Sequence, residues 1–231
     1  KYPDNFAFML AHPTLPNIWY GTIEGIDQPG QVVVFTQQQG RLVECQRCSA
    51  GGRSSCYLYY DPKQDWLIVV NYWDSNFRVY QVLTDGTLGC CLQTSSPDPW
   101  VVQHQPDRTF HWKYRQRWSH QHCCVVEPYH DTLFYFPDLG LDQIRIRKRH
   151  PDGEGLVEVG QVPLPTGKGP RHLVFHPHYQ VGYLVNELDS TVTVLSYLGL
   201  QQPWLQSVQN ISSLPSEFTN DMVNHLSLIH I

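Results

Sequence analysis

Short apolar runs separated by turn residues organise this chain. Runs such as 66–70 and 133–136 are rich in β-branched and aromatic residues, and Gly, Pro, Asp and Asn divide them from one another. No window shows a sustained helical period with capping residues. The pattern therefore predicts many short β-strands and a protein that is nearly all β.

The strand pattern repeats, and prolines mark the repeat. Four prolines, each preceded by His, Asp or Glu, open segments of similar order: Pro13, Pro62, Pro128 and Pro177. The first and second are 49 residues apart, and so are the third and fourth. Each segment continues with an apolar run, a polar residue, a second apolar run and a glycine turn. A unit of about 50 residues with about four short strands is typical of a β-propeller blade.

The interval between the second and third units is longer. Residues 95–117 replace the alternating pattern with Ser and Pro and then with a basic aromatic stretch, so we expect a loop or extended connector there. We interpret the cationic and aromatic residues of 108–118 as lining the entrance to the central channel of such a propeller. Arg145, Arg147 and Arg149 alternate with other residues, which predicts a strand with one solvated face.

Composition narrows the class of protein. The chain has 231 residues, 41% of them hydrophobic and 16% charged, with a formal net charge of -5. This balance argues against a general nucleic-acid surface, and the apolar runs are far too short to span a membrane. Seven cysteines with two vicinal pairs do not resemble a secreted disulfide framework, and Cys45 and Cys48 lack the second pair that a zinc site needs. We expect a soluble cytoplasmic protein without nucleic-acid or membrane partners.

Two histidines precede the third repeat proline. His120 and His122 are separated by one residue, so a regular strand would place both imidazoles on one side. An imidazole near neutral pH can take a proton from water and return it to a leaving oxygen. A histidine pair can also bind a metal or simply hydrogen-bond a loop.

The fourth repeat adds a cation and an acid. Gly169-Pro170 predicts a tight turn that places Arg171 at the start of a strand, where its planar donors suit a phosphate, a carboxylate or an oxyanion. Asn186 and Glu187 leave the second strand of this unit. Both charged residues have a structural alternative, which is pairing across neighbouring blades.

The polar residues that end the second strands are expected to line one face. Asn186-Glu187 stands at the register that we match to Asn71-Tyr72 and to Pro137-Asp138. In the third unit we expect Gly140 to supply a positive φ and Asp142 to cap the turn.

Together these motifs resemble the lactonase family of seven-bladed β-propellers. That family includes 6-phosphogluconolactonases and 3-carboxy-cis,cis-muconate lactonizing enzymes, and the likeness rests on the order and spacing of Arg115-Gln116, His120-Gln-His122, Asp138 to Asp142, Gly169-Pro-Arg-His172 and Asn186-Glu187. The resemblance implies four-stranded antiparallel blades, of which about four or five of the seven fit this chain. It implies one partial domain over residues 1–225, with 226–231 resembling a non-native tail.

The resemblance also implies an activity, the hydrolysis of 6-phosphogluconolactone by acid and base chemistry without a cofactor or metal. His122 would activate water, Arg171 would bind the anion or the developing oxyanion, and Glu187 would orient the histidine or exchange a proton. The residues expected to contact the small anionic lactone are His120, Arg115, Asp138, Asn186 and Asn71.

Three other functions stay open at this stage. The first is lactonization of a carboxylated muconate, and the second is a propeller that serves only as a binding scaffold. The third places a divalent metal on the axis, held by oxygen atoms of Asn71, Asp138, Asn186 and Glu187.

Overall fold

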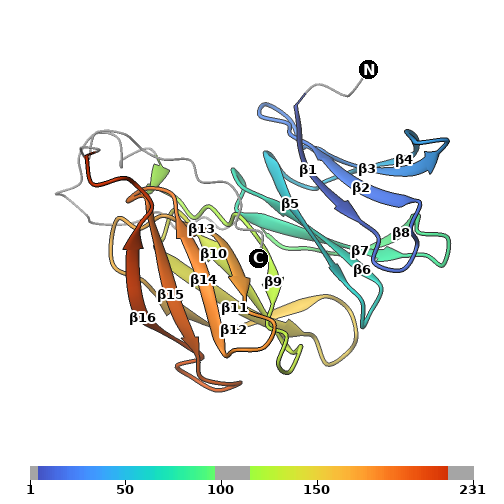
Figure 1. Cartoon of the computed structure of the whole chain (residues 1–231). Coiled ribbons are helices and arrows are strands. Elements are labelled where there is room, and N and C mark those ends of the chain that lie inside the picture. The colour runs from blue at the N-terminus through green and yellow to red at the C-terminus, as the bar shows by residue number, and fades with distance from the viewer. Residues whose placement is uncertain (1–4, 97–114, 218–231) are drawn as a thin grey trace. The chain divides into compact units, whose positions relative to one another are not determined.

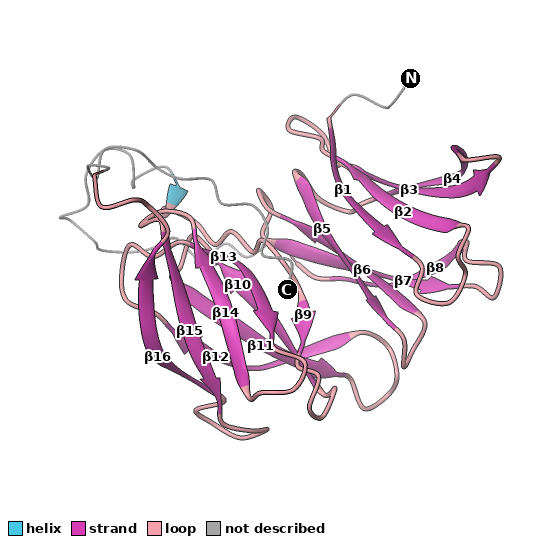
Figure 2. Ribbon diagram, in the orientation of Figure 1, coloured by secondary structure: helices cyan, strands magenta, loops and turns pink. Residues whose placement is uncertain are grey.

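The computed structural model describes residues 5–96 and 115–217, and strands dominate both ranges (Figures 1 and 2). The described strands form four sheets of four antiparallel strands, and each sheet follows the chain order. The expected all-β architecture of four-stranded blades is confirmed. The expected tail at 226–231 and most of the expected connector lie outside the described residues, and the single domain over 1–225 stays a prediction.

Two compact units contain these sheets, two sheets in each. The first unit holds β1 (Phe6–Ala11), β2 (Ile18–Ile23), β3 (Gln31–Gln38) and β4 (Arg41–Ser49), followed by β5 (Ser55–Asp61), β6 (Trp66–Asn71), β7 (Asn76–Val82) and β8 (Leu88–Thr94). The second holds β9 (Val125–Val126), β10 (Leu133–Asp138), β11 (Gln143–Arg149) and β12 (Leu156–Pro163), followed by β13 (Pro170–Phe175), β14 (Val181–Asn186), β15 (Thr191–Tyr197) and β16 (Leu205–Ser212).

The second strand of a blade supplies much of the core. Every residue of β6 and of β10 is buried, which explains why these strands read as continuous apolar runs rather than as alternating ones. The fourth strand is the opposite case, since β16 is exposed at all positions but the first. Within the described ranges, no helix is both long enough and apolar enough to cross a membrane.

The residue before each repeat proline caps a turn. Glu127 is fully buried, and its carboxylate accepts hydrogen bonds from backbone N–H groups between Tyr129 and Leu133 at 2.7 to 3.3 Å. His12 and His176 do the same with Nδ1, and Asp61 with Oδ1. The residue before each repeat proline is therefore a hydrogen-bond acceptor, and in every blade it closes the turn between the first and second strands.

The expectation of a solvated arginine face on β11 is wrong. Ile144 and Ile146 are buried on one side, and Arg147 on the other side is only 5% exposed. Its guanidinium lies 4.3 Å from the centroid of the Phe136 ring and donates to Glu158 Oε2 at 3.0 Å. Burial outweighs the nearby carboxylate and lowers the pKa of Arg147 to about 10. The arginine face is covered because the guanidinium groups of Arg147 and Arg149 lie over the rings of Phe136 and Phe134 in β10.

The role expected of Gly140 also differs. Asp142, not Gly140, has the positive φ in this turn, at 51°. Gly140 is required for space, because a Cβ at this position would lie 1.6 Å from the carbonyl oxygen of Trp118. The turn after β10 thus presses directly against the backbone that leads to His120.

We expect Gly140→Ala to destabilise the protein by about 3 kcal/mol or more, since backbone atoms must move to admit the methyl group. Gly153→Ala is the matched control: Gly153 has a φ of 79° but nothing within 4 Å of the added Cβ, so only about 1 kcal/mol of backbone strain is expected. Thermal unfolding of both variants measures the difference. Equal losses would show that conformation, not space, selects glycine at 140.

Candidate active site

A β-bulge recurs at one position in the first strand of every described blade. The pairing register shifts between Phe6 and Phe8, between Ser55 and Tyr57, and between Pro170 and His172. In the third blade the bridge from Gln121 to Asp138 and the pairing of Val125 with Tyr135 leave one extra residue on the first strand. The bulged residues are Ala7, Cys56 and Arg171 in three of the blades. In the third blade the extra residue lies within 122–124, and the repeat spacing assigns it to His122.

His122 and Arg171 therefore occupy equivalent positions in neighbouring blades of the second unit. Each bulged residue precedes its repeat proline by six positions. The sequence shows this spacing, but it does not show that a bulge lies there. A bulge leaves one residue out of the ladder and re-aims its side chain. The same device thus places the predicted base and the predicted anion-binding group at matching points of two adjacent sheets.

The bulge also changes the argument for the histidine pair. The regular strand that would place His120 and His122 on one side is absent, because β9 begins only at Val125 and the pairing is irregular between Gln121 and Val125. Period-two alternation does not apply across a bulge. The alternation argument for a shared side therefore does not hold for these two histidines.

The register that we matched for the polar strand ends is wrong by one residue in the third blade. Asn71, Asp138 and Asn186 each end a second strand, and each pairs with the residue five positions later. Leu139, not Asp138, is then the counterpart of Glu187. Because a shift of one residue exchanges the faces of a strand, Asp138 does not share the environment of Glu187.

Glu187 lies between two arginines. Its side chain has no exposed surface; Oε1 accepts from Arg115 Nη2 at 2.7 Å, and Oε2 accepts from Arg171 Nη1. Burial acts to raise the pKa of the Glu187 carboxyl, but the charges and hydrogen bonds of Arg171 and Arg115 outweigh it and the pKa is lowered. Glu187 is therefore an anion that holds two guanidinium groups in place. We call these three residues the Arg115–Glu187–Arg171 cluster.

His122 is a buried neutral base beside this cluster. The residue is 6% exposed, and its ring meets the His172 ring in a T-shaped contact with centroids 5.0 Å apart. Burial lowers the pKa of His122 well below its ordinary value, and the positive charge of Arg171 lowers it further. Near pH 7 the imidazole can therefore accept a proton. The contact with His172 was not anticipated, although His172 is part of the quoted Gly169-Pro-Arg-His motif.

The Asp138 side chain hydrogen-bonds the backbone around His120. The Asp138 carboxylate is buried and accepts from Ser119 Oγ at 2.5 Å, from His120 N at 2.8 Å and from the N–H groups of Gly140 and Leu141. Burial raises the pKa of Asp138 despite these bonds. The side chain that we predicted to contact substrate thus anchors the chain around His120, and its binding role stays a prediction.

The two asparagines are also engaged in local bonds. Asn186 is fully buried, its Nδ2 donates to the hydroxyls of Thr191 and Thr193, and its Oδ1 has no partner in the described part of the chain. Asn71 lies in the other unit, where its Nδ2 donates to Ala50 O and to Asn76 Oδ1.

The donor set does not favour a divalent metal. The Glu187 oxygens face two cations, and the Asp138 oxygens are bonded to a hydroxyl and to backbone N–H groups. A cation would have to displace those donors. Across residues 5–96 and 115–217, no group of three or more His, Cys, Asp or Glu side chains is placed to hold an ion.

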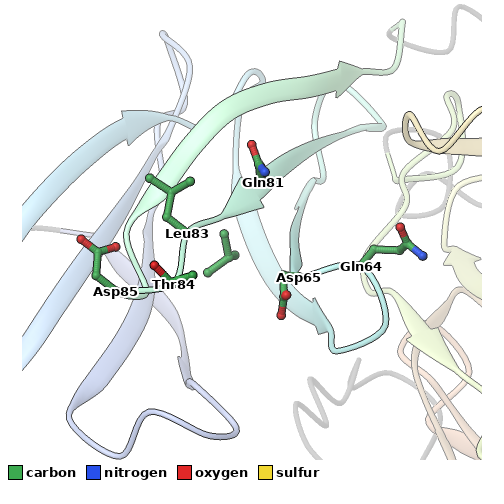
Figure 3. A pocket seen from close by; sticks show the side chains of 7 residues that line it. Gln64, Asp65, Gln81, Leu83, Thr84 and Asp85 are labelled. Atoms are coloured by element: carbon green, nitrogen blue, oxygen red, sulfur yellow. The ribbon is translucent and has the colours of Figure 1, made fainter.

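The first unit has a hollow whose lining includes none of these residues. It has a volume of about 450 Å³ and lies beside the turns that precede β6 and follow β7. Figure 3 shows its lining, which is mostly polar and consists of Gln64, Asp65, Gln81, Val82, Leu83, Thr84 and Asp85. Asn71 ends β6 away from this turn, and no predicted site residue lines the hollow.

The lowered pKa of Glu187 predicts how acid affects stability. A carboxyl with a lower pKa in the folded than in the unfolded state adds stability above its unfolded value of about 4.5, and that stability is lost as the pH falls through the folded value. We expect Glu187→Gln to lose on the order of 3 kcal/mol at pH 7 and to show a flatter decline below pH 4.5.

Denaturant unfolding between pH 7 and pH 3 tests this, with the exposed Glu154→Gln as control. Parallel stability curves for the wild type and Glu187→Gln would contradict the assignment of an ionised, arginine-bound Glu187.

Comparisons of the sequence with known proteins point to one family. A family model described as "Lactonase, 7-bladed beta-propeller" matches residues 6–231. The chain is 27% identical over 212 residues to a 6-phosphogluconolactonase of Bacillus subtilis, covering 91% of this chain and 56% of the relative. It is 37% identical over 113 residues to a 6-phosphogluconolactonase of Klebsiella pneumoniae, covering 48% of this chain and 32% of the relative.

Solved structures agree in fold. The periplasmic gluconolactonase of Pseudomonas aeruginosa superposes with a TM-score of 0.77 at 22% identity, covering 95% of this chain and 60% of that one. A Lactobacillus plantarum protein gives the same TM-score and identity, with 95% and 59% covered. The chain spans little more than half the length of these proteins and of the Bacillus relative. With its bulged four-stranded blades and the match from residue 6 onward, the chain belongs to the lactonase family of seven-bladed β-propellers.

Proposed function

We propose that the protein hydrolyses a sugar-acid lactone and that 6-phosphogluconolactone is its substrate. The family supports a lactone substrate, and curated relatives that match much of the chain are named 6-phosphogluconolactonases. The observation that carries the proposal is the pairing of a neutral buried imidazole with a fixed guanidinium at equivalent bulges. These two groups can supply what lactone hydrolysis requires, a base for water and a stabilising charge for the oxygen that becomes negative.

The proposed reaction begins with His122. The imidazole takes a proton from a water molecule while the water oxygen forms a bond to the lactone carbonyl carbon. Arg171 stabilises the negative charge that develops on the carbonyl oxygen. The intermediate then breaks its ring C–O bond, and the leaving oxygen takes the proton from His122. The product is the open-chain hydroxy acid, and no proton or electron is left over.

Glu187 has a different role in this proposal from the one expected. Its bonds go to Arg115 and Arg171, and its lowered pKa keeps it ionised, so it is a poor proton donor near neutral pH. It fixes the guanidinium groups instead. Arg115 and Arg171 exceed Glu187 by one positive charge, which suits an anionic substrate.

The proposed setting is the cytoplasm and the pentose phosphate pathway. All seven cysteines are free thiols, which suits a reducing compartment.

We expect His122→Ala and Arg171→Ala each to lower kcat/KM for 6-phosphogluconolactone by about 10²-fold to 10⁴-fold in the intact protein, because each removes a group that acts in the transition state. His178→Ala, in an exposed turn of the same unit, is the control and should retain activity. Both lactones are assayed, the phosphorylated sugar lactone and a carboxylated muconolactone. Turnover of only the second would replace the proposed substrate, and full activity of both alanine variants would reject the assigned roles.

The lowered pKa of His122 predicts the acid limb of the rate profile. Protonation removes the base, so kcat/KM should fall only at a pH well below the ordinary histidine value of 6.5. Arg171→Lys keeps the positive charge and should leave the limb there, whereas Arg171→Gln removes one cause of the shift and should move the limb upward. A limb at or above pH 6.5 in the wild type would contradict His122 as the base.

A further inference from the structure

One buried carboxylate outside the proposed chemistry joins three separate segments of the second unit. Asp142, in the turn between β10 and β11, is 5% exposed. Its Oδ1 accepts from Gln116 Nε2 at 2.8 Å and from Gly169 N at 2.7 Å, and its Oδ2 accepts from Gly167 N at 2.7 Å. The chain positions that meet here are 26, 27 and 25 residues away from Asp142, so this is a tertiary cross-link and not merely a turn cap.

Each bonded segment leads to a member of the Arg115–Glu187–Arg171 cluster. Gln116 directly follows Arg115, and Gly169 stands two residues before Arg171. Gly169 O accepts from Glu187 N at 2.8 Å. Each of the three charged residues is therefore within two residues of a group that bonds Asp142 or Gly169. Asp142 is the residue that connects these bonds.

The loop that Asp142 holds has little freedom to rearrange. Gly169 has a φ of 60°, and a Cβ there would lie 2.4 Å from Leu188 Cγ. Leu188 N also donates to Lys168 O at 3.1 Å. Asp142 itself adopts a φ of 51°, a left-handed conformation that aspartate tolerates better than most residues. A local strain of this kind persists where surrounding bonds hold it in place.

We propose that Asp142 is a positioning residue that holds Arg115, Glu187 and Arg171 in register by bonding Gln116 and the 167–169 loop. A carboxylate is needed because all three donors are N–H groups, and the amide of an isosteric asparagine would turn one acceptor into a donor. The proposal rests on the proposed function only for its effect on turnover; its effect on the cluster can be measured without a substrate.

The direct test is the titration of Glu187 in Asp142→Asn. Carbon-13 NMR of labelled glutamate carboxyls, assigned with Glu187→Gln, follows that titration in the full chain. Loosening the arginines should raise the pKa of Glu187 towards its ordinary value. Removing a nearby negative charge has the opposite effect, because it lowers the pKa of a carboxyl. An upward shift therefore reports lost positioning, and an unchanged or lower pKa overturns the proposal.

Glu127→Gln is the matched control. Glu127 is also a buried carboxylate that accepts backbone N–H groups in the second unit, but its bonds close the turn after β9. We expect this variant to lose thermal stability while the Glu187 titration stays at the wild-type position. An equal upward shift in Glu127→Gln would show that general destabilisation, not Asp142, moves the cluster.

Turnover gives the second measurement. If the protein is a lactonase, Asp142→Asn should lower kcat/KM by about 10-fold to 100-fold through misplaced arginines, while Glu127→Gln stays near the wild type. If neither the wild type nor any variant hydrolyses a lactone, the proposed function fails and the NMR result still decides the role of Asp142.

If Asp142→Asn does not fold, Gln116→Ala removes one of the three donors, and a smaller upward shift of the Glu187 pKa is expected; no shift overturns the proposal.

Discussion

The single extra residue in the first strand of each blade is the constraint on which the candidate site depends. A regular ladder would keep His122 and Arg171 in the alternation of their strands, where a neighbouring strand dictates which face they use. The bulge removes them from that alternation at the same point of two successive sheets. A repeated backbone irregularity thus builds one site from residues that are 49 positions apart.

The negative charge of buried Glu187 is stabilised by two arginines rather than by water. A carboxylate without exposed surface is costly to ionise, and Glu187 remains ionised because two guanidinium groups bond it. Burial is the main cause of the lowered pKa of His122, and the same arginines lower that pKa further, so the cations that suit an anionic substrate also help to keep the imidazole neutral. The neutral state of the base and the positive charge for an anion are therefore linked through one electrostatic cluster.

Much of the polar pattern serves the scaffold. The residue before each repeat proline closes a turn, Asp138 anchors the backbone near His120, and Gly140 gives room to the Trp118 carbonyl. Sequence reasoning found these residues but could not separate them from substrate contacts, because a buried acceptor for backbone N–H groups and a ligand-binding carboxylate use the same residue types. The arginines of β11 show the same difficulty, since their alternation resembles a solvated face although they pack on aromatic rings.

The amino-acid sequence by itself determined the all-β class, the repeat of about 50 residues and the order of strands, because alternation, turn residues and repeated prolines are local signals. It also indicated His122, Arg171 and Glu187 as a group. Only the tertiary structure decided the bulges, the correct register of Asp138, the contact of His122 with His172 and the link from Asp142 to the arginine cluster. Those features depend on which residues meet across strands and loops, and spacing along a chain does not specify such pairings.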